Sequence, residues 1–462
     1  MKVYKQAWFW LLVGIVVFLI NQLPFLTDMR PVMYDEAWYA NTGYNFSQGD
    51  GFLNTVAGTR GNSNYLLPTL TGLMFWVFGY SLFTIRLTAV LCGVVTMIFL
   101  HLCMKELKSS VKAEIAVLAF FVSIALFNTI FRFGRPECAS LMCMAGGIWF
   151  LLRYIQEKSW GNMMGLSVFT FLATIGHPYA LLFFALTGTW LLFNTIQEKK
   201  WMNLTHLILL LLAAVAAIGS IAWVSYVFNG SGEDYVSTRF SISNIWVALP
   251  EYLKECFISK HSIYMIPLFA VAMVCCRSQN LRTKVLAYVA LVYLTIFPFL
   301  FSTDLMMIGL GLDYVALIST ILIAPCVDRI KDKEIVYRRL AYYTIVIYCL
   351  TNIGISYHYN YKVKYEKCNT VLHKELREII PEDAVIFAPI RQYPLLLENK
   401  CYSDHYWKEL PANYDYVVLN SQDKDVYENS IQIQKKLEKY ELVYERGTKQ
   451  YGVVQVFKSV SD

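Results

Sequence analysis

Charge is what this sequence has least of. Of its 462 residues only 16% are Asp, Glu, Lys or Arg, whereas 56% are hydrophobic. Soluble domains carry about 25% charged residues, and a globule of 53.2 kDa needs a polar surface. With a mean hydropathy of +0.43, the composition excludes an ordinary soluble protein and indicates a polytopic α-helical membrane protein.

Common cofactor and metal motifs are also missing. There is no GxxxxGK[ST] loop and no GxGxxG fingerprint, which argues against an ATP-driven pump and a nucleotide-binding fold. The 11 cysteines form no CxxC pair, and most lie in or beside apolar runs as small buried or lipid-facing residues. Only Cys368 and Cys401 share a polar region, where an oxidising compartment would allow a disulfide. The 40 basic and 34 acidic residues are too evenly balanced to indicate nucleic-acid binding.

Long apolar runs are what the sequence has in place of charge. Runs of about 17–25 residues cross a bilayer, and they predict about 11 spans, near 7–26, 85–104, 113–130, 137–155, 162–177, 179–196, 204–228, 262–276, 284–301, 312–328 and 339–357. A further apolar stretch, 65–80, is shorter and is interrupted by Pro68, Gly72 and Gly79. It either spans the bilayer or lies at the interface.

The distribution of basic residues decides between these alternatives. If 65–80 does not cross, one side of the membrane collects most of the loop clusters, which are Lys2 and Lys5; Lys105, Lys108 and Lys112; Arg153 and Lys158; Lys199 and Lys200; Arg277, Arg282 and Lys284; and Arg329, Lys331, Lys333, Arg338 and Arg339. Cytoplasmic loops carry such an excess. The N-terminus is therefore expected on the cytoplasmic side of the cell (inner) membrane, with 65–80 as an interfacial or re-entrant helix.

Two outer loops and a C-terminal domain follow from this topology. The loops cover 27–82 and 229–261, within a membrane domain of residues 1–357. Residues 358–462 are richer in charge and predict a small α/β domain, with strands near 384–388, 414–420, 440–446 and 451–458 and helices near 368–380 and 425–439. Because the number of spans is odd, this domain is expected to be extracytoplasmic.

The first outer loop carries two adjacent acids, Asp35 and Glu36, among aromatic residues. Their mutual repulsion and partial desolvation near the membrane surface favour a proton acceptor. The alternative is a solvated loop start within an aromatic belt.

A second cluster, FRFGRPECASL at 131–141, places Arg132, Arg135 and Glu137 at the outer mouth of two apolar helices. Charged residues at the centre of the bilayer cost about 2.5–3.5 kcal/mol, so charges near membrane depth face a cavity and need partners. Pro136 suits the first turn of a helix, where the helix dipole favours Glu137. The arginines suit a phosphate group, and an Arg–Glu cap at the membrane edge is the alternative.

Two further polar breaks complete the set. His177 in IGHPYA is a metal ligand, a phosphate donor or a turn residue, and Asp313 with Tyr314 begins a span as a cap or as part of a site. All four clusters map to the outer face. We therefore expect one extracytoplasmic cavity to collect Asp35, Glu36, Glu137, His177 and Asp313, which would distinguish an enzyme from a plain helical bundle.

The order of these parts resembles the GT-C superfamily of polyprenyl-phosphate-sugar glycosyltransferases, in the branch of the protein O-mannosyltransferases and the lipid A aminoarabinose transferase. The segments that carry the resemblance are DEAWYA, YLLPTLTGLMFWVFGYSLFTIRLTAVLCG, RPECASL at 135–141 and GHPYAL at 176–181. It covers roughly residues 1–330 and implies a GT-C-like membrane fold with interfacial helices in the first outer loop.

The resemblance also implies roles for the acids. Asp35 would deprotonate the acceptor hydroxyl, with Glu36 as its neighbour in the acidic motif, and Glu137 would shape the pocket or help to hold a divalent ion. A metal site, if there is one, would draw on Asp35, Glu137 and His177, and no other cofactor is expected.

Two departures concern the donor phosphate. Asn64 or Tyr65 stands where relatives carry a lysine, and Asp313–Tyr314 stands where many carry Arg-Tyr. The expected substrate-binding set is therefore Arg60, Tyr65, Arg135, His177, Arg239 and Tyr314.

The predicted function is inverting transfer of a sugar from a polyprenyl-phosphate donor to a lipid, glycan or protein acceptor outside the cytoplasm. Such a donor carries its own leaving group, so transfer needs a base and stabilisation of the departing phosphate but no ATP. In-line attack predicts inversion. The alternatives are a secondary transporter or flippase, whose ionisable residues are expected near the bilayer midplane on repeated helices, and a non-catalytic envelope scaffold.

Overall fold

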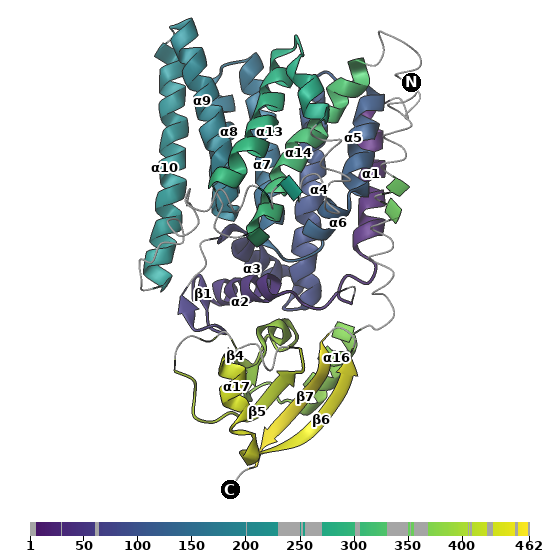
Figure 1. The fold of residues 1–462 in the computed structure, drawn as a ribbon, viewed down its shortest axis with the longest axis vertical. Helices are drawn as coiled ribbons and strands as arrows, with labels where there is room; N and C mark the ends of the chain where they lie inside the picture. Colours follow the sequence, from purple (N-terminus) through teal and green to yellow (C-terminus); the bar gives the residue numbers. More distant parts are fainter. Residues whose placement is uncertain are drawn as a thin grey trace.

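The computed structural model describes most of the chain. The described residues are 6–28, 30–60, 64–199, 201–229, 250, 253–254, 270–300, 305–329, 350–351, 353–354, 368–404, 406, 409–422, 428–448 and 451–460. A long helical bundle occupies one end of the molecule and a small mixed sheet the other, with two short helices between them (Figure 1).

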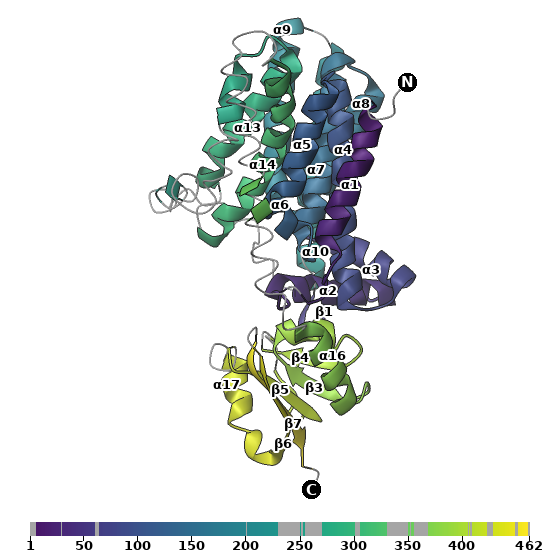
Figure 2. The same cartoon turned by 90° about the vertical axis from the view of Figure 1, so that its right-hand side faces the viewer.

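The bundle is built from apolar helices, most of them long, that lie side by side (Figures 1 and 2). They are α1 (Ala7–Gln22), α4 (Leu82–Glu106), α5 (Val111–Ser123), α6 (Ala125–Ile130), α7 (Pro136–Gln156), α8 (Trp160–Gly176), α9 (Leu181–Glu198), α10 (Trp201–Asn229), α13 (Leu281–Leu300) and α14 (Leu305–Arg329). Among the described residues, four stretches are long and apolar enough to cross a membrane: Leu82–Glu106, Pro136–Gln156, Pro178–Glu198 and Asn203–Val224.

The helices coincide with most of the apolar runs in the sequence. The expected spans 262–276 and 339–357 lie largely outside the described residues, as does most of the outer loop 229–261, so the number of spans stays a prediction. The run 113–130 differs, because it is divided between α5 and α6 at Ile124. Asn128 lies just beyond the break, and its amide donates to the Val122 carbonyl at 3.0 Å, which satisfies an acceptor that a terminating helix leaves open.

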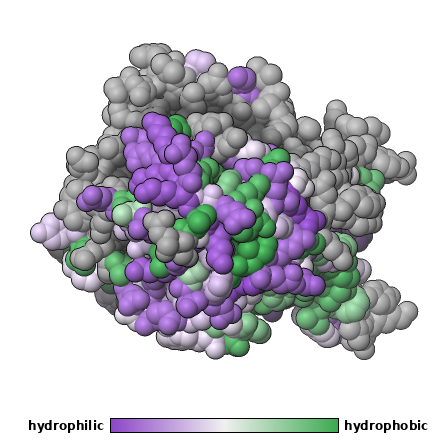
Figure 3. All heavy atoms as spheres, turned by 90° about the horizontal axis from the view of Figure 1, so that it is seen from below, coloured by the Kyte–Doolittle hydropathy of each residue, from purple (hydrophilic) through white to green (hydrophobic). Residues whose placement is uncertain are grey.

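The surface of the bundle is more apolar than the surface of the sheet domain. Leu211, Leu212 and Val215 on α10 expose more than half of their surface, which a bilayer would cover. Seen from the end that carries the sheet, hydrophilic residues surround a smaller hydrophobic patch (Figure 3). The molecule therefore divides into a lipid-facing bundle and a water-facing domain.

The first outer loop forms two short helices that lie across the end of the bundle, α2 (Tyr34–Gln48) and α3 (Leu66–Phe78), with a small hairpin of β1 (Leu53–Asn54) and β2 (Thr59–Arg60) between them (Figure 1). With 13 residues, α3 is about 20 Å long, too short for a hydrocarbon core of about 30 Å. Its C-terminal residues Trp76 and Val77 are exposed, as in a helix resting on a membrane interface. The length and exposure of α3 agree with the expected interfacial helix, whose position at a membrane stays a prediction.

A buried ion pair fastens α2 to the bundle. Arg86 of α4 and Glu36 of α2 are both fully buried, and the guanidinium donates to the two carboxylate oxygens at 2.8 and 2.9 Å. The remaining Arg86 N–H groups donate to the carbonyls of Leu26, Thr27 and Arg30 at 2.8–3.3 Å. Because paired and hydrogen-bonded charges are the form in which burial is tolerated, this pair fixes where α2 begins.

The C-terminal domain is a five-stranded mixed sheet of order β4-β3-β5-β7-β6. Its strands are β3 (Val385–Ala388), β4 (Lys400–Ser403), β5 (Tyr416–Asn420), β6 (Tyr440–Thr448) and β7 (Gly452–Ser459). The expected strands are present, whereas β4 is an addition. The helices are α16 (Cys368–Ile379) and, within the range 425–439, α17 (Glu428–Gln434) with a 3₁₀ turn, η5 (Leu437–Lys439).

Side-chain alternation gives the sheet two different faces. Ile386, Val418 and Val456 pack with α16 and with the first outer loop, while Phe387 and Val417 pack with α17. One core therefore runs from the sheet through α16 into α2 and α3. The expected boundary at 357/358 falls outside the described residues.

Hydrogen bonds join the same surfaces. The Asn369 amide donates to the carbonyls of Thr27 and Arg30 at 2.6 and 2.8 Å. Buried Asp28 accepts from the backbone N–H and hydroxyl of Thr370 at 2.8 and 2.7 Å. No disulfide joins Cys368 to Cys401, and both side chains are buried. Packing and the hydrogen bonds above therefore hold this region.

Replacing Arg86 with leucine is expected to lower the free energy of unfolding by about 3–5 kcal/mol, because it leaves the buried Glu36 carboxylate without a counter-ion. Thermal unfolding of the detergent-solubilised full chain measures this. Arg153→Leu is the matched control. Arg153 on α7 makes a partly exposed pair with Glu106 at 3.9 Å and lies 5.3 Å from the centre of the Trp149 ring, and the loss of such exposed contacts should cost about 1 kcal/mol or less. Equal effects of both substitutions would contradict the anchoring role of Arg86.

Candidate active site

Two of the expected acids share one arginine at the end of the bundle that carries α2. Arg135 lies 2.9 Å from the Glu137 carboxylate and 3.3 Å from the Asp35 carboxylate. Glu137 is buried, whereas the Asp35 side chain is 41% exposed. The neighbouring carboxylates of Glu137 and Asp35 raise the pKa of the Arg135 guanidinium despite its desolvation, so Arg135 stays cationic at any working pH.

The start of α7 explains this geometry. Arg135 is the extended residue before the helix, Pro136 occupies its first turn and Glu137 follows, where a proline and a carboxylate are both favoured. Just before them, the Gly134 N–H donates to the Glu36 carboxylate at 3.4 Å. The anchored pair of Glu36 and Arg86 therefore also positions the backbone from which Arg135 reaches Asp35.

Helix α14 adds a second buried acid to this cluster. Asp313 is buried and interacts electrostatically with Glu137 and Arg135. Its Oδ1 atom makes no hydrogen bond to any described residue. Next to it, the Tyr314 hydroxyl donates to Ser140 of α7 at 2.8 Å, which fixes α14 against the helix that carries Glu137.

The turn between α8 and α9 completes the site. The ring of His177 lies 6.3 Å from that of Tyr314, and His177 interacts electrostatically with Glu137. Nδ1 of His177 accepts a hydrogen bond from the Tyr179 N–H at 3.4 Å, which orients the ring within the turn. A Cβ on Gly176 would come within 3.1 Å of the Ser140 Cα, so glycine permits this close approach of α8 to α7.

Four of the five residues expected in one cavity therefore lie close together, and the fifth, Glu36, does not join them. Arg135 pairs with Asp35 and Glu137, and Glu137 in turn interacts electrostatically with His177 and Asp313. Glu36 turns away, and both of its oxygens are engaged by Arg86. The expected repulsion between Asp35 and Glu36 is offset as well, because each carboxylate has its own arginine.

The residues expected to bind the donor phosphate lie in different surroundings. Arg135 is engaged by carboxylates. Tyr65 precedes α3, with its ring 5.1 Å from that of Phe52. The Arg60 side chain and the whole of Arg239 lie outside the described residues.

Several residues of the site did not stand out in the sequence. Arg86, Ser140 and Tyr293 lie in apolar helices, and Tyr293 stacks on Tyr314 with ring centres 6.3 Å apart. A charged residue near membrane depth needs a partner, and that rule could have singled out Arg86 without identifying Glu36.

The described part of the chain holds no group of three or more His, Cys, Asp or Glu side chains arranged to bind a metal ion. Asp35, Glu137 and His177 were the expected ligands, but the guanidinium of Arg135 lies between the two carboxylates. This arrangement does not fit a metal, and no step below uses one.

Comparison with known proteins agrees with the fold. Residues 65–223 match the model of the dolichyl-phosphate-mannose-protein mannosyltransferase family. No curated protein sequence matches the chain. The crystal structure of ArnT from Cupriavidus metallidurans bound to undecaprenyl phosphate is similar over 98% of both chains, with 12% identity and a TM-score of 0.65.

The crystal structure of the same protein in its apo state is similar over 98% of this chain and 97% of that one, with 12% identity and a TM-score of 0.64. At this identity the likeness concerns the fold. The resemblance drawn from the sequence is confirmed at that level: the chain has the membrane fold of the GT-C superfamily with a C-terminal mixed-sheet domain.

Proposed function

We propose that this protein transfers a sugar from a polyprenyl-phosphate donor to an acceptor hydroxyl, with inversion at the anomeric carbon. The observation that carries the proposal is the exposed Asp35 carboxylate held at 3.3 Å by Arg135, which buried Glu137 holds in turn. A general base must be reachable by the proton that it removes and be oriented by its neighbours. Asp35 meets both conditions.

In the proposed reaction Asp35 accepts the proton of the acceptor hydroxyl as its oxygen attacks the anomeric carbon. The bond from that carbon to the phosphate oxygen breaks, and polyprenyl phosphate leaves with the electron pair. Attack from the face opposite the phosphate gives inversion. Arg135 and Glu137 act as positioning residues for the base, and we assign Glu36 to anchoring α2, not to the chemistry.

An apolar groove beside the site suits the lipid part of such a donor. It lies between α9 and α10, has a volume of about 490 Å³, and is lined by Leu181, Phe184, Ala185, Gly188, Thr189, Leu192, Leu207, Leu210, Leu211 and Ala214. It begins at Leu181, directly after the turn that holds His177. We assign the polyprenyl chain to this groove, which lets the phosphate reach the polar end of the bundle.

The distribution of charge supports an extracytoplasmic site. Arg153 and Arg282 lie at the opposite end of α4, where Arg153 pairs with Glu106 and Arg282 donates to the Glu106 carbonyl. Cytoplasmic ends carry such basic residues. We therefore place Asp35 and the C-terminal domain outside the inner membrane, with the N-terminus in the cytoplasm.

The two alternatives are less well supported. A transporter predicts ionisable groups near the bilayer midplane, whereas this cluster lies at the start of α7 and beside α2 (Figure 1). A non-catalytic scaffold places no demand on the distance between Asp35 and Glu137, yet both carboxylates contact the same guanidinium.

Asp35→Asn is expected to lower transfer from a polyprenyl-phosphate sugar by at least about 100-fold, the size of a general-base contribution. The unfolding temperature should change little, because the side chain is 41% exposed and its ion pair is long. Asp50→Asn, an exposed acid that follows the same helix, is the control and should retain wild-type transfer. Full activity of Asp35→Asn would refute the assignment of the base.

Arg135→Gln is expected to destabilise the protein because it strands the buried Glu137 carboxylate, with a cost of about 3–5 kcal/mol. The double variant Arg135→Gln, Glu137→Gln should recover much of this loss, since no uncompensated charge remains. A double-mutant cycle on unfolding free energies in detergent measures the coupling. Additive effects of the two substitutions would show that the pair does not act as a unit.

A further inference from the structure

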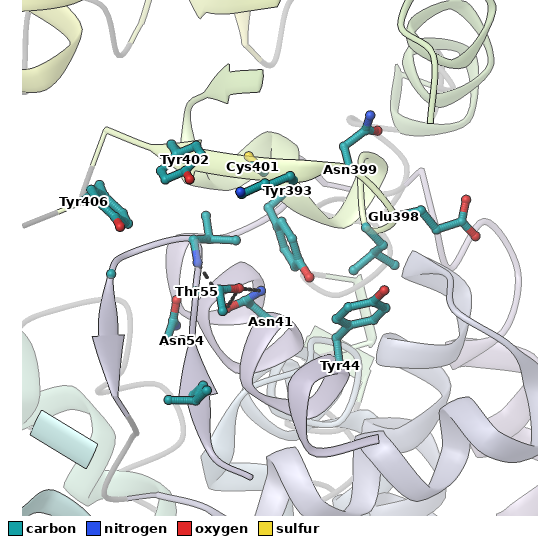
Figure 4. Close-up of a pocket in the computed structure, with 15 residues that line it drawn as sticks. Asn41, Tyr44, Asn54, Thr55, Tyr393, Glu398, Asn399, Cys401, Tyr402 and Tyr406 are labelled. Carbon is teal, nitrogen blue, oxygen red and sulfur yellow. Dashed lines mark hydrogen bonds between the residues drawn. The ribbon is translucent and has the colours of Figure 1, made fainter. Parts of the chain in front are cut away.

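A second cavity lies away from the candidate active site, where the C-terminal domain meets the first outer loop (Figure 4). It has a volume of about 520 Å³, within the range of about 300–1,000 Å³ usual for ligand sites. One wall comes from α2 and the β1 hairpin, and the other from β4, the chain before it and Tyr406. The proposed chemistry uses none of these residues.

Tyrosines dominate the lining of this cavity. Tyr44, Tyr393, Tyr402 and Tyr406 border it together with Asn41, Asn54 and Thr55. The rings of Tyr402 and Tyr406 meet edge to face with centres 5.0 Å apart. Tyr393 is buried and its hydroxyl points toward Asn41 and Tyr44, but it makes no well-formed hydrogen bond to any residue that the structure describes.

Two contacts hold Tyr406 in a fixed orientation at the wall of the cavity. A Cβ on Gly58 would lie 2.7 Å from the Tyr406 ring, and the φ of Gly58 is +68°, so only glycine lets this ring lie against the hairpin. On the other side, the Asn429 amide donates to the Tyr406 carbonyl at 2.7 Å. An aromatic side chain that is already ordered in the free protein loses little conformational entropy when a ligand binds against it.

The polarity of the lining identifies the class of ligand. Its charged members, Glu398 and Lys400, have opposite signs and lie exposed at the rim, so the cavity does not select an anion. Aromatic faces cover apolar C–H surfaces, while tyrosine hydroxyls and amide groups exchange hydrogen bonds with hydroxyls. A neutral sugar offers both kinds of surface.

An extended peptide fits less well, although β4 is the edge strand of the sheet and edge strands accept peptides as added strands. The Ser403 N–H of β4 already donates to the Val56 carbonyl of the outer loop at 2.9 Å, and the Ser403 hydroxyl donates to the same oxygen at 2.9 Å. The loop thus occupies part of the edge that a peptide would need.

Helix α2 connects this cavity to the proposed base. Asn41 and Tyr44 follow Asp35 on the same helix, about 9 and 13 Å farther along its axis. Asp35 faces Arg135 on the bundle side, whereas Asn41 and Tyr44 face the C-terminal domain. A ligand here therefore lies beside, not in, the reacting centre.

We propose that the cavity between α2 and β4 is a carbohydrate-binding subsite that holds a neutral sugar unit of the acceptor, remote from the hydroxyl that reacts. The assignment of this sugar to the acceptor rests on the proposed function, whereas the binding of a carbohydrate does not. The C-terminal domain thereby takes part in substrate recognition.

The test is binding of the fluorescently labelled full chain in detergent to an array of neutral mono- to tetrasaccharides. The wild type should bind at least one of them. Tyr406→Ala should weaken binding by at least about tenfold through loss of the aromatic wall, and Tyr393→Phe by about three- to tenfold, the loss expected for one hydrogen bond. Tyr414→Phe is the matched control, because Tyr414 is also buried with an unpartnered hydroxyl but lies in the core of the domain outside the cavity.

Three results would overturn the proposal. The wild type could bind no sugar on the array, Tyr414→Phe could weaken binding as much as the cavity variants do, or both cavity variants could bind as well as the wild type. Binding of an extended peptide at this cavity in place of a sugar would overturn it as well. Asp35→Asn separates the two claims, since it should keep array binding and lose transfer. Undiminished transfer by Asp35→Asn together with sugar binding by the wild type would remove the base and leave the subsite standing.

Discussion

The rest of the structure depends on the buried pair of Glu36 and Arg86. Charged groups survive at this depth only with partners for every donor and acceptor, and here the partners come from three places: α2, the chain after α1 and the link before α7. The pair therefore fixes the outer loop, the start of α7 and the backbone that carries Arg135. Asp35 is placed by what its neighbour Glu36 binds.

This anchoring connects both proposed sites. Helix α2 is held to the bundle at its start and is covered by the C-terminal domain along its length. Asp35 faces one of these parts, whereas Asn41 and Tyr44 face the other. The short helix α2 thus presents the proposed base, Asp35, to the bundle, and presents Asn41 and Tyr44 to the opposite side. The C-terminal domain supplies the other wall of the proposed carbohydrate subsite.

Much of the fold follows from local patterns in the sequence. Apolar runs locate the helices, and alternation locates four strands of the sheet, because both reflect burial of one face of a regular element. Strand β4 has only four residues, KCYS, with too little alternation to be recognised. The break at Ile124 depends on Asn128, whose hydrogen bond to Val122 is formed only in the folded chain.

The site was predictable only in part, for a similar reason. Scarcity of charge singled out Asp35, Glu36 and Glu137, yet sequence cannot tell which of two adjacent acids faces an arginine 50 positions away. Tertiary contacts decide that Glu36 pairs with Arg86 and Asp35 with Arg135. The cavity at Tyr393 is less predictable still, since it exists only where residues more than 300 positions apart meet, as Val56 and Ser403 do.

If Asp35, oriented by Arg135 and Glu137, is the base of a sugar transfer at the outer end of the bundle, a structure of the protein with a bound polyprenyl-phosphate sugar will show it. We expect the lipid phosphate at the end of the bundle that carries α2, with the Asp35 carboxylate on the face of the sugar opposite that phosphate. A phosphate bound at the end that carries Arg153 and Arg282, or a sugar that does not face Asp35, would contradict it.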